Sequence, residues 1–160
     1  MKPERNLQIA LKLLNQIKYA TIATTDSDQP WNTPVFTAYD HELNFYWSSF
    51  GGAQHSQNIA LNNKVFLVIY NSASPEGIGL YISATASKLV SKTEISKGLE
   101  VLGERRKKKF DLNSFQNGSQ TLYKATPVSM WLNDWLKNDE GEFVKDYRFE
   151  LSIQELKRQI

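Results

Sequence analysis

The segment from Tyr46 to Gln57 has the residue types best suited to chemistry, because it combines small hydroxyl residues, two adjacent glycines and a histidine. A strand pattern ends there and a helical pattern begins. Backbone N–H groups at the start of a helix favour an anion, and Gly51 and Gly52 let a ligand approach the backbone closely. The side chains that can add donors are Ser48, Ser49, His55 and Ser56. The pattern predicts an anion site, although an ordinary loop with a serine N-cap has the same composition.

The chain contains no cysteine and only two histidines, His41 and His55. The absence of cysteine excludes disulfide bonds, thiolate catalysis and every cysteine-ligated metal site. Two histidines are too few for a histidine-rich metal centre, so we predict no metal site. No side chain stands out as a general acid or base, and the catalytic residues therefore stay unassigned.

Length and composition predict one globular domain over residues 1–160. This length is enough to bury a core, and 41% hydrophobic with 22% charged residues exclude a disordered chain. No apolar stretch approaches the roughly 20 residues that span a bilayer, so no membrane helix is expected. The first residues lead into an amphipathic pattern without an apolar signal core, which predicts a cytoplasmic protein.

The charge is unevenly distributed along the chain. The formal net charge is +2, but residues 92–109 hold seven basic and three acidic side chains. A field this mild does not indicate a nucleic-acid-binding protein. We interpret the run from Arg105 to Lys109 as the solvated last turns of a helix, where the helix dipole favours cations. Phosphate binding by this run is the alternative, and it predicts an affinity that falls steeply with salt.

Apolar residues at helical spacing predict an amphipathic helix over 7–17 and a short helix over about 54–62. Two capping boxes open further helices. One begins at Ser91 and leads to the basic run, and the other begins at Ser152 near the C-terminus.

The remaining periodicity is that of strands, predicted over 19–25, 31–39, 43–48, 65–70, 79–90, 122–135 and 143–151. Pro34 cannot donate to a ladder, so the second strand is expected at an edge or a bulge. Phe36, Phe45 and Tyr46 are assigned to the core, and residues 111–120 to a loop. Six or more strands with short connections predict a mostly antiparallel, small closed or split barrel, which removes sheet edges.

The order of elements resembles that of the pyridoxamine 5′-phosphate oxidase-like family of flavin-binding split barrels. The resemblance covers nearly the whole chain, through "YATIATTDSDQPWNTPVFTAYDHELNFYWSS", "GGAQHSQNIALNNKVFLVIYN", "GIGLYISATASKLV" and the tail motifs "VSMWLND" and "DYRFEL". It implies a mainly β fold with flanking helices, a six-stranded antiparallel Greek-key split barrel. It also implies a homodimer with one FMN in each of two clefts at the interface.

The resemblance assigns the flavin-binding residues position by position. It places Thr33, Pro34 and Val35 along the isoalloxazine ring, and Trp47, Ser48 and Ser49 against the ring and the ribityl chain. It assigns binding of the FMN phosphate to Gln54 and His55, at the two positions where the family commonly has Arg-Lys. The family's strand arginine is replaced here by Thr33. Only His55 can therefore supply charge at the phosphate, near its ordinary pKa of about 6.5.

Two further residues match the family's C-terminal Trp and Arg, which approach the flavin from the second subunit. These are Trp131 and Arg148. A cation at the pyrimidine edge of the ring would stabilise the anionic reduced flavin. The alternatives are that Trp131 and Trp135 are surface aromatics of the barrel, and that Arg148 pairs with Asp146 at the surface.

The predicted function is an FMN-binding, flavin-dependent oxidoreductase acting on an unidentified small molecule, with no nucleic-acid or membrane partner. Pyridoxamine-phosphate oxidation itself is not predicted, because arginines that would hold a substrate phosphate are scarce. One alternative is a flavin carrier or stress-response module without turnover. Another is a different ligand in the same cleft, either a deazaflavin or haem, with His41 and His55 as the available imidazoles.

Overall fold

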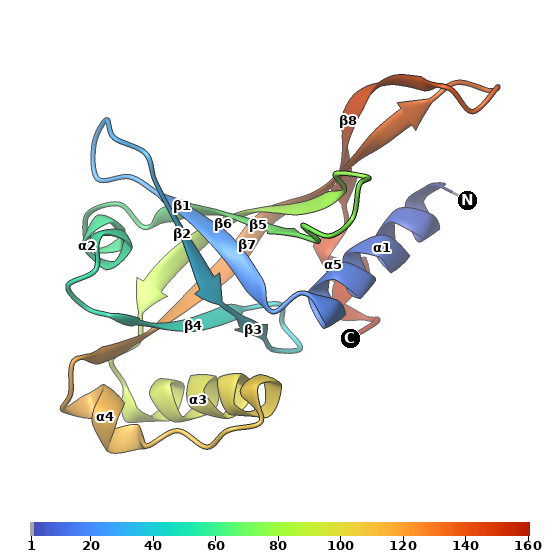
Figure 1. Cartoon of the computed structure of the whole chain (residues 1–160). Helices are drawn as coiled ribbons and strands as arrows, with labels where there is room; N and C mark the ends of the chain where they lie inside the picture. Colours follow the sequence, from blue (N-terminus) through green and yellow to red (C-terminus); the bar gives the residue numbers. More distant parts are fainter. Residues whose placement is uncertain (1) are drawn as a thin grey trace.

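The computed structural model describes residues 2–160 as one antiparallel sheet flanked by helices (Figure 1). The strands are β1 (Tyr19–Thr24), β2 (Trp31–Phe36), β3 (Ala38–Tyr39), β4 (Phe45–Phe50), β5 (Lys64–Tyr70), β6 (Gly79–Lys88), β7 (Gln120–Lys137) and β8 (Phe143–Leu151). The helices are α1 (Lys2–Gln16), α2 (Gln54–Leu61), α3 (Lys92–Arg106), α4 (Leu112–Gln116) and α5 (Ile153–Lys157). The mainly β architecture with flanking helices is therefore confirmed.

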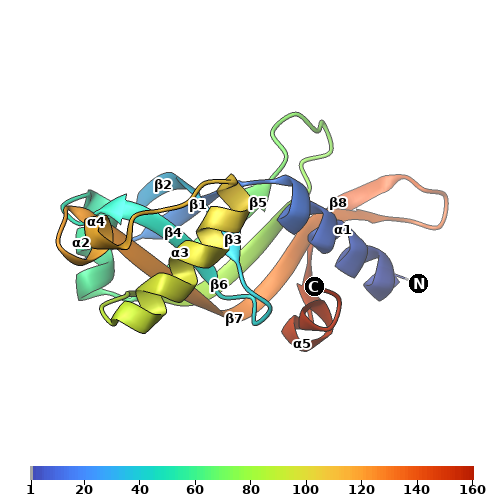
Figure 2. The same ribbon diagram turned by 90° about the horizontal axis from the view of Figure 1, so that it is seen from below.

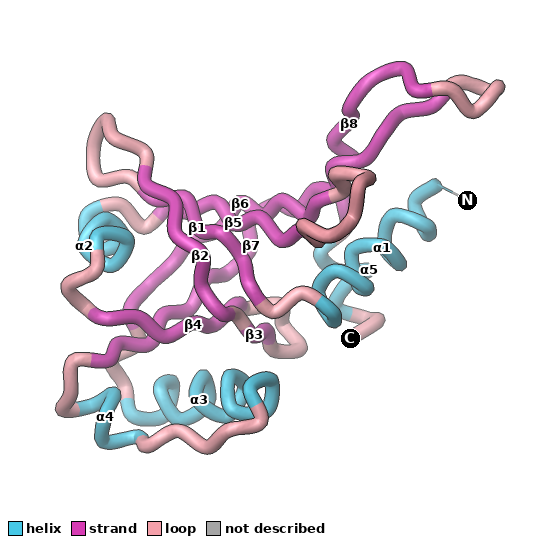
Figure 3. Tube along the Cα trace, in the orientation of Figure 1, coloured by secondary structure: helices cyan, strands magenta, loops and turns pink. Residues whose placement is uncertain are grey.

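The sheet has eight strands on an open path, so the expected count of six is not met. Its order is β2-β1-β5-β6-β7-β4-β3, with β8 paired to the C-terminal half of β7, residues 130–137. The ends of the path, β2 and β3, are separated in sequence only by Thr37, so the sheet curls until its edges meet (Figure 3). No ladder joins these two edges within residues 2–160. The predicted strand 31–39 divides at Thr37, because its N–H donates to the carbonyl of Lys18 at 2.9 Å.

Pro34 lies on an edge strand, as its missing N–H requires. Within the described part of the chain β2 pairs only with β1, where Pro34 stands opposite Thr21. An edge strand has a neighbouring strand on one side only, so the missing N–H of a proline there affects at most one ladder. The expectation of an edge position is confirmed.

Two clusters of buried side chains form the core. The larger one fills the curl of the sheet and is closed by the apolar stripe of α1. The smaller one lies between α3 and the other side of β4. Phe45 therefore belongs to the first cluster and Tyr46 to the second, although they are neighbours on one strand. The assignment of both to the core is confirmed, and Phe36 packs partly buried against the second cluster.

The first arginine of the basic run is a structural residue and not part of a solvated face. Arg105 donates from Nη2 to the carbonyls of Leu14 at 2.6 Å and Ile17 at 2.8 Å. These carbonyls lie where α1 ends, and a helix end leaves such acceptors without partners. Burial lowers the pKa of Arg105, and its guanidinium lies 5.5 Å from the ring of Tyr39. The expected solvated run is thus corrected at this position.

The turn between β3 and β4 is organised by Asp40. Its carboxylate accepts from the backbone N–H of Asn44 at 2.9 Å and from the hydroxyl of Tyr46 at 2.9 Å, and it pairs with Lys97 of α3 at 3.3 Å. Burial alone would raise the pKa of Asp40, but the hydrogen bonds from Asn44, Tyr46 and Lys97 together hold it below its ordinary value. The turn therefore ties α3 to the sheet.

Both predicted serine caps are present, while the return bond of a capping box, from the serine N–H to the glutamate side chain, is made in neither helix among residues 2–160. The N–H of Glu94 donates to Ser91 Oγ at 3.2 Å, and the N–H of Glu155 donates to Ser152 Oγ at 3.2 Å. Each serine satisfies one of the N–H groups that a helix start leaves free. The starts of α3 and α5 follow from these contacts.

The expectation of a loop over 111–120 is wrong in its first half. Residues 112–116 form the short helix α4, and Asp111 caps it by accepting from the N–H of Asn113 at 3.1 Å. Asn, Ser and Gln are neutral to weak helix formers, so composition alone indicates a loop. The aspartate N-cap was the signal that favoured a helix.

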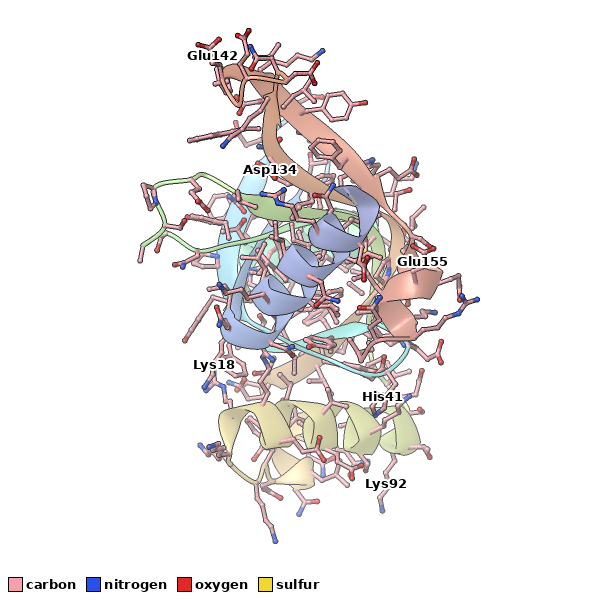
Figure 4. All side chains as sticks on the ribbon, turned by 90° about the vertical axis from the view of Figure 1, so that its right-hand side faces the viewer. Lys18, His41, Lys92, Asp134, Glu142 and Glu155 are labelled. Carbon is pink, nitrogen blue, oxygen red and sulfur yellow. The ribbon has the colours of Figure 1, made fainter. Side chains whose placement is uncertain are left out.

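The last strand pair extends beyond the rest of the sheet as a hairpin arm, residues 135–148, at the end of the molecule that holds the N-terminus (Figures 1 and 4). At its base Asp134, which is buried, accepts from Arg5 of α1 at 2.6 Å. None of the helices in residues 2–160 is long and apolar enough to cross a membrane.

Candidate functional site

The junction of β4 and α2 brings the predicted donors together. Ser49 Oγ and His55 Nε2 lie 2.7 Å apart, and the His55 side chain is 6% exposed. Burial lowers the pKa of His55, and no charged group opposes this effect. The imidazole is therefore neutral at neutral pH, and its hydrogen bond to Ser49 joins two uncharged groups.

The start of α2 lacks a side-chain cap. The N-cap is Ala53, so the alternative of a serine-capped loop is wrong. The nearby Ser56 hydroxyl donates instead to the carbonyl of Phe50 at 3.0 Å. The N–H groups of the first turn, from Gln54 to Ser56, find no acceptor in the described part of the chain. Uncapped N–H groups at a helix start are suited to an anion.

The two glycines allow the backbone to pass close to its neighbours. A Cβ on Gly52 would lie 2.6 Å from the ring of Phe50, and one on Gly51 would lie 3.1 Å from Thr121 Oγ1. A larger residue at Gly52 would have to displace the aromatic ring. The loop that precedes α2 is thus kept tight by the absence of side chains.

The side chain of Gln54 turns along the helix. Its amide donates to Asn58 Oδ1 at 2.8 Å, and Asn58 Nδ2 donates to Thr24 Oγ1 of β1 at 3.1 Å. Asn58 is almost fully buried, so this chain of bonds holds α2 against the sheet. Asn58 was not predicted as a functional residue. Its place next to the apolar Ile59 in a short helix was the sequence feature that indicated a buried polar side chain.

The three predicted residues of β2 do not share one face. Cross-strand partners in an antiparallel pair point to the same side of a sheet. Thr33 stands opposite the buried Ile22, so Thr33 and the buried Val35 face inward, whereas Pro34 faces outward. The Thr33 hydroxyl accepts from the indole N–H of Trp31 at 2.9 Å. Trp31, 45% exposed at the same edge, was not predicted as a site residue.

Trp47 and Ser48 of β4 face opposite sides of the sheet. Trp47 is 0% exposed and stacks on Tyr123, with ring centroids 5.5 Å apart, so it presents no group to a ligand in the single chain. Ser48 stands opposite Leu122, which belongs to the cluster beside α3, and stays partly exposed on that side. The Ser49 side chain points to the same side as Trp47.

Trp131 and Arg148 lie together on the outer face of the sheet. The guanidinium of Arg148 lies 4.8 Å from the centre of the Tyr81 ring, and Trp131 stacks on Phe66 at 6.3 Å. No ion pair joins Arg148 to Asp146 among residues 2–160, so that alternative is wrong. A cavity of about 390 Å³ beside Trp131 and Arg148 reaches α1 and α5.

These two groups of predicted residues are far apart in one chain. Ser49 stands opposite Thr121 of β7, and Trp131 lies ten residues further along that strand. A strand rises about 3.3 Å per residue, which makes the separation roughly 30 Å. Figure 2 shows α2 at one end of the molecule and β8 at the other. The structure thus joins the side chains of Ser49 and His55 at one end, and Trp131 and Arg148 at the other. Ser48 lies on the opposite face of β4, and the Gln54 side chain is engaged with Asn58.

The outer sheet face remains partly uncovered between these ends. Most of its side chains are apolar or aromatic, come from five strands and are not fully buried in the single chain; these are Pro34, Ala23, Phe66, Val68, Tyr81 and Trp131. Thr21, Ser83 and Ser129 are polar members of the same face. An incompletely buried, mostly apolar face of this kind is suited to an interaction.

No family model and no curated protein sequence matches the chain. Solved structures do match in fold. A Clostridium acetobutylicum protein described as related to general stress protein 26 and as pyridoxinephosphate oxidase family is 16% identical, over 94% of this chain and 96% of that chain, with a TM-score of 0.65. The haem storage protein HutZ from Vibrio cholerae is 18% identical, over 76% of this chain and 90% of that chain, with a TM-score of 0.62. A protein named F420 Reductase is 18% identical, over 74% of this chain and 93% of that chain, with a TM-score of 0.57. At these identities the similarity shows the fold.

Proposed function

Because this chain has the fold of the pyridoxamine 5′-phosphate oxidase-like proteins, we propose that it binds FMN between two copies of itself and acts as a flavin-dependent oxidoreductase on a small molecule. The observation that carries the proposal is the donor set at the β4–α2 junction. Ser49, His55 and the uncapped N–H groups of the first turn of α2 lie side by side. This set fits a phosphate group, which accepts several hydrogen bonds at once.

The ring of the flavin would lie beyond this phosphate site. At the edge of β2, the exposed Trp31, whose indole N–H donates to Thr33 Oγ1 at 2.9 Å, would supply an aromatic contact there. Bound FMN would supply the hydride or electron transfer. No general acid or base is needed from the chain for hydride transfer alone.

Two copies are required because one chain separates its two groups of site residues by roughly 30 Å. A two-fold axis through the outer sheet face would set the α2 end of one copy beside the β8 end of the other. Arg148 of each copy would then supply a cation to the flavin held by the other, where it favours the anionic reduced ring. The apolar character of the outer face supports this arrangement.

Binding without turnover is the second candidate, because the fold is shared with HutZ and F420 Reductase, whose names indicate haem and a deazaflavin. The positions of the two histidines favour FMN over haem, because neither is placed as a free axial ligand at the β4–α2 junction. His55 already uses Nε2 for Ser49, and His41 is exposed on the β3–β4 turn beside α3 (Figure 4).

Titrating the purified protein with FMN is expected to quench flavin fluorescence and to saturate at one FMN for each chain. Riboflavin, which lacks the phosphate, is expected to bind at least about tenfold more weakly, because charge-assisted hydrogen bonds contribute roughly 1.5–3 kcal/mol. Absorbance spectra after adding FMN, haem or F420 separate the candidates. Uptake of haem or F420 but not FMN would overturn the proposal, and reduction of bound FMN by NADH or NADPH distinguishes an enzyme from a carrier.

A further inference from the structure

At the β4–α2 junction the titratable side chain is His55, and the turn between β1 and β2, which follows Thr24 beside α2, adds Asp26 and Asp28. The neighbouring elements β1, β2 and β4 carry no Asp, Glu, Lys or Arg, and α2 carries none either. On β5, β6 and β7 the charged residues at this end are Lys64, Lys88 and Lys124, and none of them contributes to the pKa of His55. Among residues 2–160, no Lys or Arg side chain bonds to Ser49 or His55.

The neutral Ser49–His55 pair has one hydrogen that is not used in the bond between its two members. If His55 Nε2 accepts from the hydroxyl, the hydrogen left over is on Nδ1. If Nε2 donates to Ser49, the hydrogen left over is on the hydroxyl. The second ring nitrogen makes no hydrogen bond within residues 2–160, so nothing in the chain already uses it.

Protonation of His55 changes this count. Both ring nitrogens then carry hydrogen, Nε2 donates to Ser49 Oγ, and the serine hydrogen is released as a donor. The pair then has two hydrogens that are not used between its members, and it carries a positive charge. A phosphomonoester has three terminal oxygens and close to two negative charges, so it matches the protonated pair better than the neutral one.

We infer that Ser49 and His55 form a neutral pair that takes up one proton from solvent when a phosphomonoester binds, and that this proton replaces the fixed cations which the site lacks. The new bond is the N–H bond at whichever ring nitrogen of His55 carries no hydrogen in the neutral pair, and no electron is transferred. The inference rests on the proposed function, since FMN is the phosphomonoester. Burial lowers the pKa of His55 in the free protein, and an adjacent dianion raises it, which is the direction that proton uptake requires.

The sign of the pH dependence follows from the uptake. Binding that consumes a proton weakens as pH rises, by up to about tenfold per pH unit while His55 is neutral when free and charged when bound. The test belongs between pH 7 and 9, because the second pKa of a phosphomonoester is about 6 and the ligand itself stays a dianion there.

Calorimetric titration with FMN at pH 7.5, in buffers that differ in ionisation enthalpy, measures the proton directly. The expected result is an uptake approaching one proton per FMN for the wild type and none for riboflavin. His55→Gln keeps a hydrogen-bonding side chain without a titrating ring and is expected to bind FMN about tenfold more weakly, with no uptake. Ser49→Ala is the matched control, expected to weaken binding while keeping the proton.

Each contrary result has a distinct meaning. FMN binding by the wild type with heat that is independent of the buffer would overturn the inference and leave the proposed function standing. Unchanged uptake in His55→Gln would overturn it as well, because the proton would then sit elsewhere. Failure of the wild type to bind FMN would remove both. A thermal melt of each variant without ligand identifies misfolding, and the wild-type measurement decides the question without any variant.

Discussion

Replacing Phe66 by Asp is expected to convert the protein from a dimer to a monomer and to remove tight FMN binding with it. Phe66 lies in the middle of the outer face, stacked on Trp131 and partly exposed. At a two-fold interface the substitution buries two carboxylates, and burial of an unpaired charge costs several kcal/mol. The dissociation constant of the dimer should rise at least about 100-fold. Analytical ultracentrifugation over a concentration series measures it.

Val90→Asp is the matched control for this change. Val90 is 76% exposed in the connection between β6 and α3, away from the outer face, and its variant should stay dimeric and bind FMN. In Phe66→Asp the loss of FMN should follow dissociation, so that raising the protein concentration recovers part of the binding. A Phe66→Asp protein that stays dimeric would show that another surface forms the dimer.

Replacing Arg105 by Met is expected to lower the free energy of unfolding by about 3 kcal/mol, since it leaves the partly buried carbonyls of Leu14 and Ile17 without this charged donor. The methionine keeps much of the apolar stem, so the loss reports the guanidinium. For a chain of this length 3 kcal/mol corresponds to a fall in Tm of roughly 6–12 °C. Thermal and urea unfolding followed by circular dichroism measure both quantities.

Arg106→Met separates this contact from the general effect of removing a charge from the basic run. Arg106 is exposed and lies 4.3 Å from the centre of the Phe36 ring, a contact at the surface that contributes about 0.5–1 kcal/mol. If Arg105→Met cost no more than Arg106→Met, the carbonyl contacts at the end of α1 would contribute little to stability.

Local patterns predicted most elements of the fold. The apolar run Val65–Tyr70 lies within β5, and the two serine caps begin α3 and α5 where expected. The Ser49–His55 pair was also within reach of the sequence, because its members are six residues apart across one strand–helix junction. Hydrophobic periodicity and helix capping depend on residues only a few positions apart, so the sequence alone can indicate them.

The features that the sequence did not predict depend on contacts across the chain. The break at Thr37 arises from a bond to Lys18, and the burial of Arg105 arises from the carbonyls of α1, about 90 residues away in the sequence. The burial of Trp47 depends on Tyr123 of β7. A position-by-position assignment cannot tell that Pro34 and Thr33 point to opposite sides of the sheet, because that requires the register of β2 on β1.

Mixing two damaged chains determines whether each FMN site is shared by two copies. One chain carries Ser49→Ala with His55→Ala, and the other carries Trp131→Ala with Arg148→Ala. Each alone should bind FMN weakly, because both of its sites lack one half. After dissociation and random re-pairing, a mixed dimer holds one site with both halves intact. The mixture should therefore recover about one tight FMN site for every four chains. No recovery from a mixture shown to contain mixed dimers would contradict the shared site.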